Sequence, residues 1–139
     1  TDWAVANVEN SCNLYHPDLV FTMWGMNDGS WRIDEQTFTD RCETLIKSIQ
    51  ANTDADILFA SSMLANALSP QNTGYVEKYH PYIENYVDDY GIGLVDVTEF
   101  SKDLYQLKSS VELLNNNINH PNDFYARCLA DLILRAIIK

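Results

Sequence analysis

Three short apolar runs punctuate the chain, and segments with helical periodicity lie between them. The runs cover residues 19–24, 57–60 and 94–97, and Leu, Val, Ile and Phe dominate them. Runs of this length without alternating polar positions are typical of strands that are covered on both faces of a sheet. We therefore expect three short, buried strands.

The segments between these runs repeat apolar residues with the spacing of amphipathic helices. Asp34 is a suitable N-cap for the first long helix. The expected inward residues of that helix are Phe38, Cys42, Leu45, Ile46 and Ile49. A second stripe contains Pro81, so this helix should kink or begin at the proline; its members are Tyr75, Tyr79, Tyr82, Ile83 and Tyr86.

Two more helices are expected in the second half of the chain. One should present Leu104, Leu107, Val111 and Leu114 on a single face. The last should run from about residue 123 to residue 138, with Phe124, Cys128, Leu132 and Ile133 inward. Residues 2–14 carry a more ragged helical pattern, and the breakers within residues 61–74 predict a loop there.

Helices that alternate with short apolar strands imply parallel strands joined by right-handed crossovers. The expected fold class is therefore α/β, with helices on both faces of a parallel sheet. No repeat, linker or low-complexity stretch divides the chain, so residues 1–139 should form a single domain.

Composition and charge narrow the choice of partners. The net charge of −11 repels phosphate backbones, so we expect neither nucleic acid nor an anionic membrane surface as a partner. No apolar run is long enough to span a membrane. The three cysteines are widely spaced without a Cys-x-x-Cys pair, so no zinc site is expected, and no motif implies an organic cofactor. No targeting segment is visible, which leaves the compartment open between secreted and cytoplasmic.

The candidate chemistry lies in two motifs far apart in the sequence. Gly-Met-Asn-Asp at residues 25–28 follows the first apolar run, and ligands bind beyond the carboxyl ends of parallel strands. There Gly25 permits a sharp turn, and the Asn27 amide is suited to stabilising a developing oxyanion. Asp28 should brace the loop through backbone N–H groups. His-Pro-Asn-Asp at residues 120–123 opens the last helix, and a histidine is the natural base for activating a serine hydroxyl.

Together these motifs resemble blocks of the SGNH/GDSL-type hydrolases, a family of esterases and lipases. The resemblance implies a flavodoxin-like, three-layer α/β/α fold with strand order 2-1-3-4-5. The three strands of this chain would be the third to fifth, and the first strands would be missing. It also implies that Asn27 is an oxyanion-hole donor and that His120 is the catalytic base. Trp24, Gly25, Met26 and Trp31 lie nearby in the sequence and are candidates for an acyl or sugar pocket; loop packing is the other explanation.

The resemblance further implies two groups that this chain does not supply. The family's nucleophilic serine follows its first strand, and no such block precedes Leu19, so the serine is expected outside this chain. Ser61 and Ser62 follow a later strand and lack the required neighbours. The family usually places an aspartate three residues before the histidine, and here that position is Asn117. An asparagine can orient an imidazole, but it cannot stabilise an imidazolium as a carboxylate does.

We expect the chain to be the C-terminal part of a carboxylesterase or carbohydrate acetyl esterase acting on a small ester or an acetylated carbohydrate. Alone it should be inactive. The alternative is a non-catalytic SGNH-like binding or structural domain. The missing first strand should pair with residues 19–24, because an unpaired apolar edge is an aggregation hazard. An upstream segment, a second chain or self-association is therefore expected to cover that strand, from Leu19 to Trp24.

Overall fold

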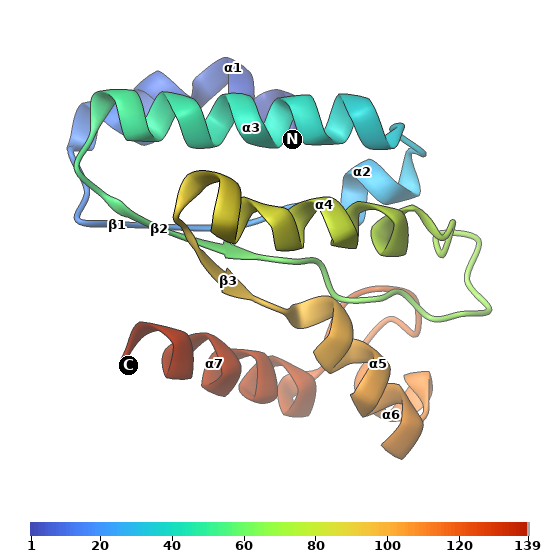
Figure 1. Cartoon of the computed structure of the whole chain (residues 1–139). Coiled ribbons are helices and arrows are strands. Elements are labelled where there is room, and N and C mark those ends of the chain that lie inside the picture. The colour runs from blue at the N-terminus through green and yellow to red at the C-terminus, as the bar shows by residue number, and fades with distance from the viewer. Residues whose placement is uncertain (139) are drawn as a thin grey trace.

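The structure, a computed structural model, describes residues 1–138, and these contain one parallel sheet of three strands. The strands β1 (Leu19–Met23), β2 (Asp56–Ala60) and β3 (Gly93–Val95) lie in the order β1-β2-β3. Leu19 pairs with Asp56, and Leu58 pairs with Gly93. Helices cover both faces of the sheet (Figure 1), so the predicted parallel α/β/α architecture is confirmed.

The helices α1 (Asp2–Ser11), α3 (Glu35–Asn52) and α4 (Tyr75–Tyr90) cover one face of the sheet. Ile57 and Phe59 of β2 point into this layer, where the rings of Phe38 and Tyr79 stack with centroids 3.9 Å apart. Full burial of one such side chain contributes about 1.5–3 kcal/mol. The period-2 pattern of β2 thus selects which of its residues meet this layer.

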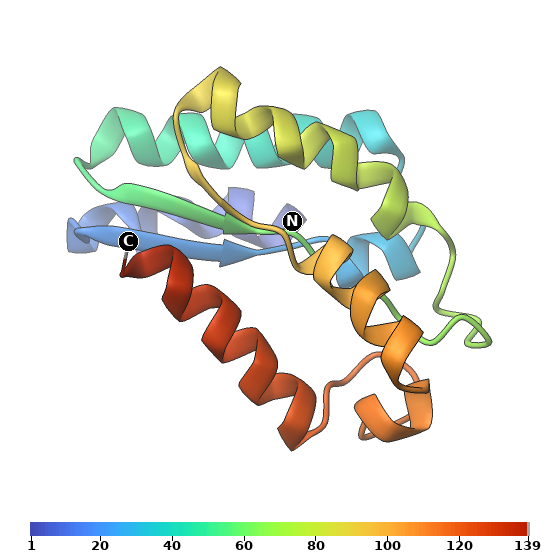
Figure 2. The same ribbon diagram turned by 60° about the horizontal axis from the view of Figure 1, so that its bottom comes forward.

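The other face of the sheet is covered by α5 (Val97–Leu107) and α7 (Asp123–Ile137) (Figure 2). Leu58 and Ala60 of β2 point into this second core, together with Leu129 of α7. The short helices η1 (Asn13–Tyr15), α2 (Met26–Ser30) and α6 (Ser110–Leu113) lie in the connections. No helix within residues 1–138 is long and apolar enough to span a membrane.

Side-chain caps fix where several helices begin. The Asp34 carboxylate accepts a hydrogen bond from the Thr37 amide at 2.9 Å, which confirms the predicted N-cap. Asp96 caps α5 through the Glu99 amide. Each cap satisfies an amide at a helix start that has no partner within the helix.

Three predictions about helices were wrong. The single helix expected to carry Leu107 and Val111 is two helices, because Ser109 and Glu112 form a capping box that starts α6 anew. Both Leu107 and Val111 are consequently exposed. A helix start at Pro81, one of the two expected possibilities, is wrong, because α4 begins at Tyr75 and continues through the proline.

The third wrong prediction concerns the inward face of α7. Phe124 is exposed, and Tyr125 is fully buried instead, with its hydroxyl hydrogen-bonded to Ser101 Oγ of α5. Cys128 is only half-buried, while Leu129 is buried. Leu132 and Ile133 pack against the core as predicted, so only the first half of the expected face is wrong, where the Tyr125–Ser101 contact turns Tyr125 inward.

The first strand is less covered than its apolar sequence predicted. Within the described residues β1 is an edge strand, and Leu19 and Phe21 are 41% and 42% exposed. Along this edge Leu19, Val20 and Phe21 line an apolar groove, whose other members include Trp3, Val8 and Cys12. The expected burial on both faces is therefore absent in residues 1–138.

Candidate active site

The loop after β1 places Asn27 directly beyond the carboxyl end of that strand. Gly25 has φ +120°, a conformation that side chains rarely adopt, and it forms the N-cap of α2. An added Cβ at Gly25 would lie 3.4 Å from Ser62 Cβ, so the turn is packed closely against the loop after β2. The Asn27 side chain is exposed and makes no hydrogen bond within residues 1–138, which leaves its amide free to donate.

The other candidate substrate-binding residues surround the same place. Trp24, Gly25, Met26 and Trp31 line one cleft together with Asn27, and its volume is ≈ 400 Å³. Trp3, which the sequence patterns did not single out, also lines this cleft, as do Arg41 and Asp2, whose side chains form an ion pair of 3.2 Å. The structure thus brings these predicted residues together, and two exposed indoles, Trp3 and Trp31, stand at its rim.

The expected role of Asp28 needs a correction. Its carboxylate is buried and accepts hydrogen bonds from the Thr1 backbone nitrogen at 2.8 Å and the Thr1 hydroxyl at 2.7 Å. The predicted bonds from loop backbone amides to this carboxylate do not occur among the described residues. Asp28 therefore ties α2 to the start of α1 rather than to its own loop.

His120 lies in the tight loop between α6 and α7. The Asn116 side-chain oxygen accepts hydrogen bonds from the backbone amides of Ile118, Asn119 and His120, each at 3.0 Å. Leu114 and Pro121 close the loop through an isolated antiparallel bridge. The His120 imidazole is exposed and makes no hydrogen bond or ion pair in the described part of the chain.

One buried side chain anchors this loop to the sheet. Asn66, in the loop after β2, donates through Nδ2 to the Asn117 carbonyl at 2.9 Å and to Asn117 Oδ1 at 3.3 Å. Its backbone amide donates to the Ile118 carbonyl at 2.7 Å. Asn117 itself is left-handed, with φ +52°, a conformation that asparagine tolerates well. Its side-chain oxygen therefore faces Asn66, and within residues 1–138 it makes no bond to His120.

Asn27 and His120 reach the same edge of the sheet from different elements. Asn27 follows β1, while the His120 loop is held by Asn66, which follows β2. The helix α2, which carries Asn27, and the loop between α6 and α7, which carries His120, both lie at the carboxyl ends of the strands (Figure 1). No hydrogen bond joins the two side chains among the described residues, and His120 does not line the cleft that contains Asn27.

The serines after β2 have structural partners. Ser61 is fully buried, donates to Asp96 Oδ1 at 3.3 Å and accepts from the Thr98 amide at 2.9 Å. Ser62 is also buried and donates to the Met63 carbonyl. Neither hydroxyl is placed to attack a substrate carbonyl.

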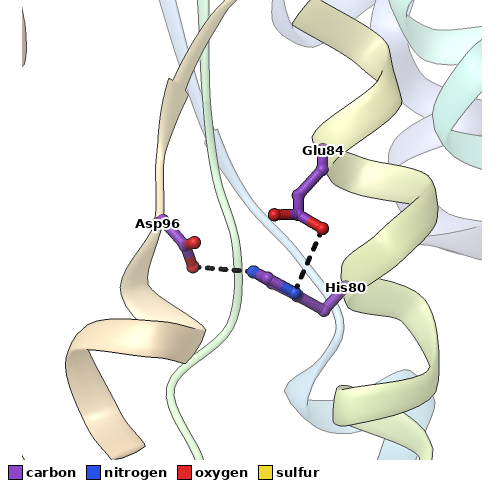
Figure 3. Close-up of side chains that lie close together, drawn as sticks. All are labelled: His80, Glu84 and Asp96. Atoms are coloured by element: carbon purple, nitrogen blue, oxygen red, sulfur yellow. Dashed lines mark hydrogen bonds and ion pairs between the residues drawn. The ribbon is translucent and has the colours of Figure 1, made fainter. Parts of the chain in front are cut away.

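A second cluster of titratable groups lies on the far side of α4. His80 is buried, and its ring meets Asp96 through one nitrogen and Glu84 through the other (Figure 3). The ligand-capable atoms of these three residues lie within 4.8 Å of one another, so they could hold a metal ion. Cysteine spacing gave no hint of this group. The available signal was His80 and Glu84 one helical turn apart, with Asp96 as the polar residue inside the third apolar run.

Comparisons with known proteins identify a family and related folds for this chain. The family model for the GDSL-like lipase/acylhydrolase family matches residues 5–124. An acetylxylan esterase from Geobacillus stearothermophilus superposes with TM-score 0.84 at 17% identity, covering 99% of this chain and 67% of that one. An α/β hydrolase from the metagenome of Lake Arreo, Spain, gives TM-score 0.80 at 19% identity, covering 96% of this chain and 65% of that one. A search of curated proteins found no match.

At this level of identity the likeness to solved structures establishes the fold. Three related structures of the Geobacillus enzyme are catalytic mutants, in which a serine, an aspartate or a histidine is replaced by alanine. In that enzyme the aspartate stands three residues before the histidine.

Proposed function

This chain belongs to the GDSL-like lipase/acylhydrolase family, and we propose that it supplies the base and one oxyanion donor of a serine ester hydrolase. One observation carries the proposal. Asn27 and His120, on segments far apart in sequence, lie exposed beyond the carboxyl ends of the parallel strands, and their side chains have no hydrogen-bond partner within residues 1–138. The three-residue spacing of the Geobacillus catalytic aspartate and histidine, which Asn117 and His120 share, supports the assignment of His120.

In the proposed reaction a serine hydroxyl attacks the ester carbonyl, and His120 accepts the hydroxyl proton. The Asn27 side-chain N–H donates to the oxygen of the tetrahedral intermediate. His120 then returns the proton to the leaving alcohol, which leaves an acyl-serine. In the second half of the reaction His120 accepts a proton from water as the water attacks the acyl-serine, and it returns this proton to the serine oxygen as the acid leaves. A neutral asparagine at position 117 cannot stabilise the imidazolium that forms on His120 as an aspartate would. The proposed enzyme therefore works mainly as a Ser-His pair.

We propose that the serine and the strand that covers β1 come from one segment outside this chain. The half-exposed Leu19 and Phe21 support this, because an edge with apolar residues invites another strand. Light scattering of the 139-residue chain provides the test. Association or aggregation of the isolated chain agrees with the proposal, whereas a stable monomer with an exposed β1 contradicts it.

The proposed substrate is a small acyl ester, with an acetylated carbohydrate as the alcohol side. The exposed Trp31 indole beside Asn27 offers an apolar face on which a sugar ring can stack. We expect Trp31→Ala to raise KM for acetylated xylo-oligosaccharides without changing kcat for p-nitrophenyl acetate. Equal effects on both substrates would contradict the carbohydrate assignment.

The catalytic roles are tested by ester hydrolysis with the longer protein that contains this chain. His120→Ala should lower kcat by about 10²–10⁴-fold and Asn27→Ala by about 10²–10³-fold. His16→Asn is the matched control, because His16 is also exposed but has a left-handed backbone before β1, at the opposite edge of the sheet. Wild-type rates in both catalytic variants would remove the mechanism.

The alternative, a non-catalytic binding or structural domain, is favoured by one contact. Asn117 Oδ1 accepts from Asn66 instead of His120, so the position of the triad acid serves loop structure. This alternative predicts no ester hydrolysis by the longer protein and binding of acetylated oligosaccharides that Trp31→Ala abolishes.

A further inference from the structure

The cluster around His80 has a two-sided geometry that the proposed esterase does not use. The His80 ring lies between α4 and the start of α5, with 8% of its side chain exposed. Nε2 lies 2.8 Å from Asp96 Oδ1. Nδ1 lies on the other side of the ring, 3.6 Å from Glu84 Oε2 and 4.0 Å from Glu99 Oε1 (Figure 3 shows His80, Glu84 and Asp96).

The short contact with Asp96 fixes the role of each ring nitrogen. A carboxylate only accepts hydrogen bonds, so Nε2 carries the proton that bonds to Asp96. In the neutral ring this leaves a lone pair on Nδ1, the ring nitrogen that lies 3.6 Å from Glu84 and 4.0 Å from Glu99. Histidines that bind metals commonly donate their other N–H to a carboxylate in this way, which fixes the tautomer and makes the ligating nitrogen more basic.

We infer that His80 Nδ1, Glu84 and Glu99 form a binding site for a divalent transition-metal ion such as Zn²⁺, with Asp96 as the carboxylate that orients the imidazole. This inference does not depend on the proposed esterase activity. The site would connect the middle of α4 to the first turn of α5, and its role would be structural.

The distances suit such an ion with small side-chain movements. Zinc bonds of ~2.0–2.2 Å at tetrahedral angles place neighbouring donor atoms ~3.4 Å apart. The Nδ1 to Glu84 separation of 3.6 Å is close to this value, and the 4.0 Å to Glu99 closes once Glu99 Oε1 leaves its ion pair with Lys102. One nitrogen and two oxygens are a suitable donor set for Zn²⁺ with water in the fourth position.

Asp96 is held in place more firmly than the ligands, as an orienting group requires. Its Oδ1 accepts hydrogen bonds from Ser61 Oγ at 3.3 Å and from the Glu99 backbone amide at 3.0 Å. Ser61 is completely buried and is itself anchored by the Thr98 amide. The outer layer of the site is thus formed before any ion arrives.

The local charges also favour a dication. Glu84, Asp96 and Glu99 bring three carboxylates to one imidazole, and Lys102 offsets them from one side through its ion pair with Glu99. The side chains of Glu84 and Glu99 are 53% and 51% exposed, which gives an ion and its remaining waters direct access from solvent.

Calorimetric titration of chelator-treated protein with ZnCl₂, after alkylation of accessible thiols, tests the site. The wild type should bind one equivalent, and Glu84→Gln should bind it at least about 10-fold more weakly. Asp96→Asn keeps a helix-capping oxygen and should weaken binding by about 10–100-fold. His80→Gln should abolish it, whereas Asp89→Asn, an exposed change on the same helix, should leave it unchanged.

The ring nitrogen that binds the ion separates this inference from adventitious binding. Zinc should shift the ¹⁵N resonance of His80 Nδ1 while Nε2 stays protonated, and it should raise the melting temperature of the wild type but not of Glu84→Gln. Absence of saturable binding, equal affinity in Glu84→Gln, or ligation through Nε2 would overturn the inference. The zinc-binding and melting results do not depend on ester hydrolysis, so they should be the same whether or not the His120 variant loses that activity.

Discussion

Asn66 is the side chain whose removal should disturb the candidate site most specifically. Asn66→Ala deletes three hydrogen bonds of a residue that is 8% exposed: those from Nδ2 to Asn117 O and Asn117 Oδ1, and that from the Leu68 amide to Asn66 Oδ1. Each such bond contributes about 0.5–1.5 kcal/mol. Because exposed Asn117 regains water, we expect a loss of about 2–3 kcal/mol in the free energy of unfolding.

Asn119→Ala is the matched control for this prediction. Asn119 also bridges the two loops, through Nδ2 and Gln71 Oε1 at 2.8 Å, but that contact is exposed. Exposed substitutions of this kind change the free energy of unfolding by about 0.5 kcal/mol or less. Urea denaturation monitored by circular dichroism gives both values.

Hydrogen exchange at one amide adds a sharper test. The Leu68 amide bonds to Asn66 Oδ1 at 3.0 Å, so its exchange should accelerate in Asn66→Ala and stay slow in Asn66→Asp, which keeps the acceptor. Equal unfolding free energies for Asn66→Ala and Asn119→Ala, or unchanged Leu68 exchange in Asn66→Ala, would refute the anchoring role of Asn66.

Four further changes have defined outcomes. Gly25→Ala should lower the unfolding free energy by about 1–3 kcal/mol because of its positive φ, and urea denaturation will show it; an unaltered midpoint would contradict the strain. Burial raises the pKa of the Cys42 thiol, so at pH 8 iodoacetamide should modify Cys128 first and Cys42 only on unfolding, as peptide mapping will show. Hydrogen bonds from Thr37 lower the pKa of Asp34 in the folded protein. The stability that the ionised Asp34 contributes is therefore present above the unfolded-state pKa of ~3.9 and is lost as the pH falls through the lower folded-state pKa. Asp34→Asn should weaken this loss of stability at acid pH, as measured by denaturation at a series of pH values. Asn117→Asp should raise kcat for ester hydrolysis if its side chain can face His120, and a lower or equal kcat would show that the position serves only the loop.

Local sequence signals predicted much of the framework. The apolar runs identified all three strands, and Asp34 marked the start of α3 because a side-chain cap acts over only a few residues. The third strand is shorter than its apolar run because Asp96 caps α5, so that Val97 is already helical. The division between α5 and α6 was also encoded locally, in the capping box of Ser109 and Glu112, but the apolar spacing across it suggested continuity.

Features that depend on contacts across the fold could not be predicted in this way. The orientation of α7 follows from the Tyr125–Ser101 contact between two helices, which no spacing within α7 encodes. The anchoring of the His120 loop by Asn66 joins segments about 50 residues apart, and the His80 cluster joins a helix to a strand end. The motifs predicted that Asn27 and His120 lie beyond the strand ends, but the Asn66 contacts that hold the His120 loop come from tertiary structure.

Labelling of the longer protein with a fluorophosphonate ester tests the central claim most directly, because this reagent marks a serine activated by its base. Peptide mapping should find one labelled serine outside residues 1–139, and His120→Ala should slow its labelling by about 10²–10⁴-fold. A label on a serine within these residues, or labelling at the wild-type rate in His120→Ala, would contradict the account.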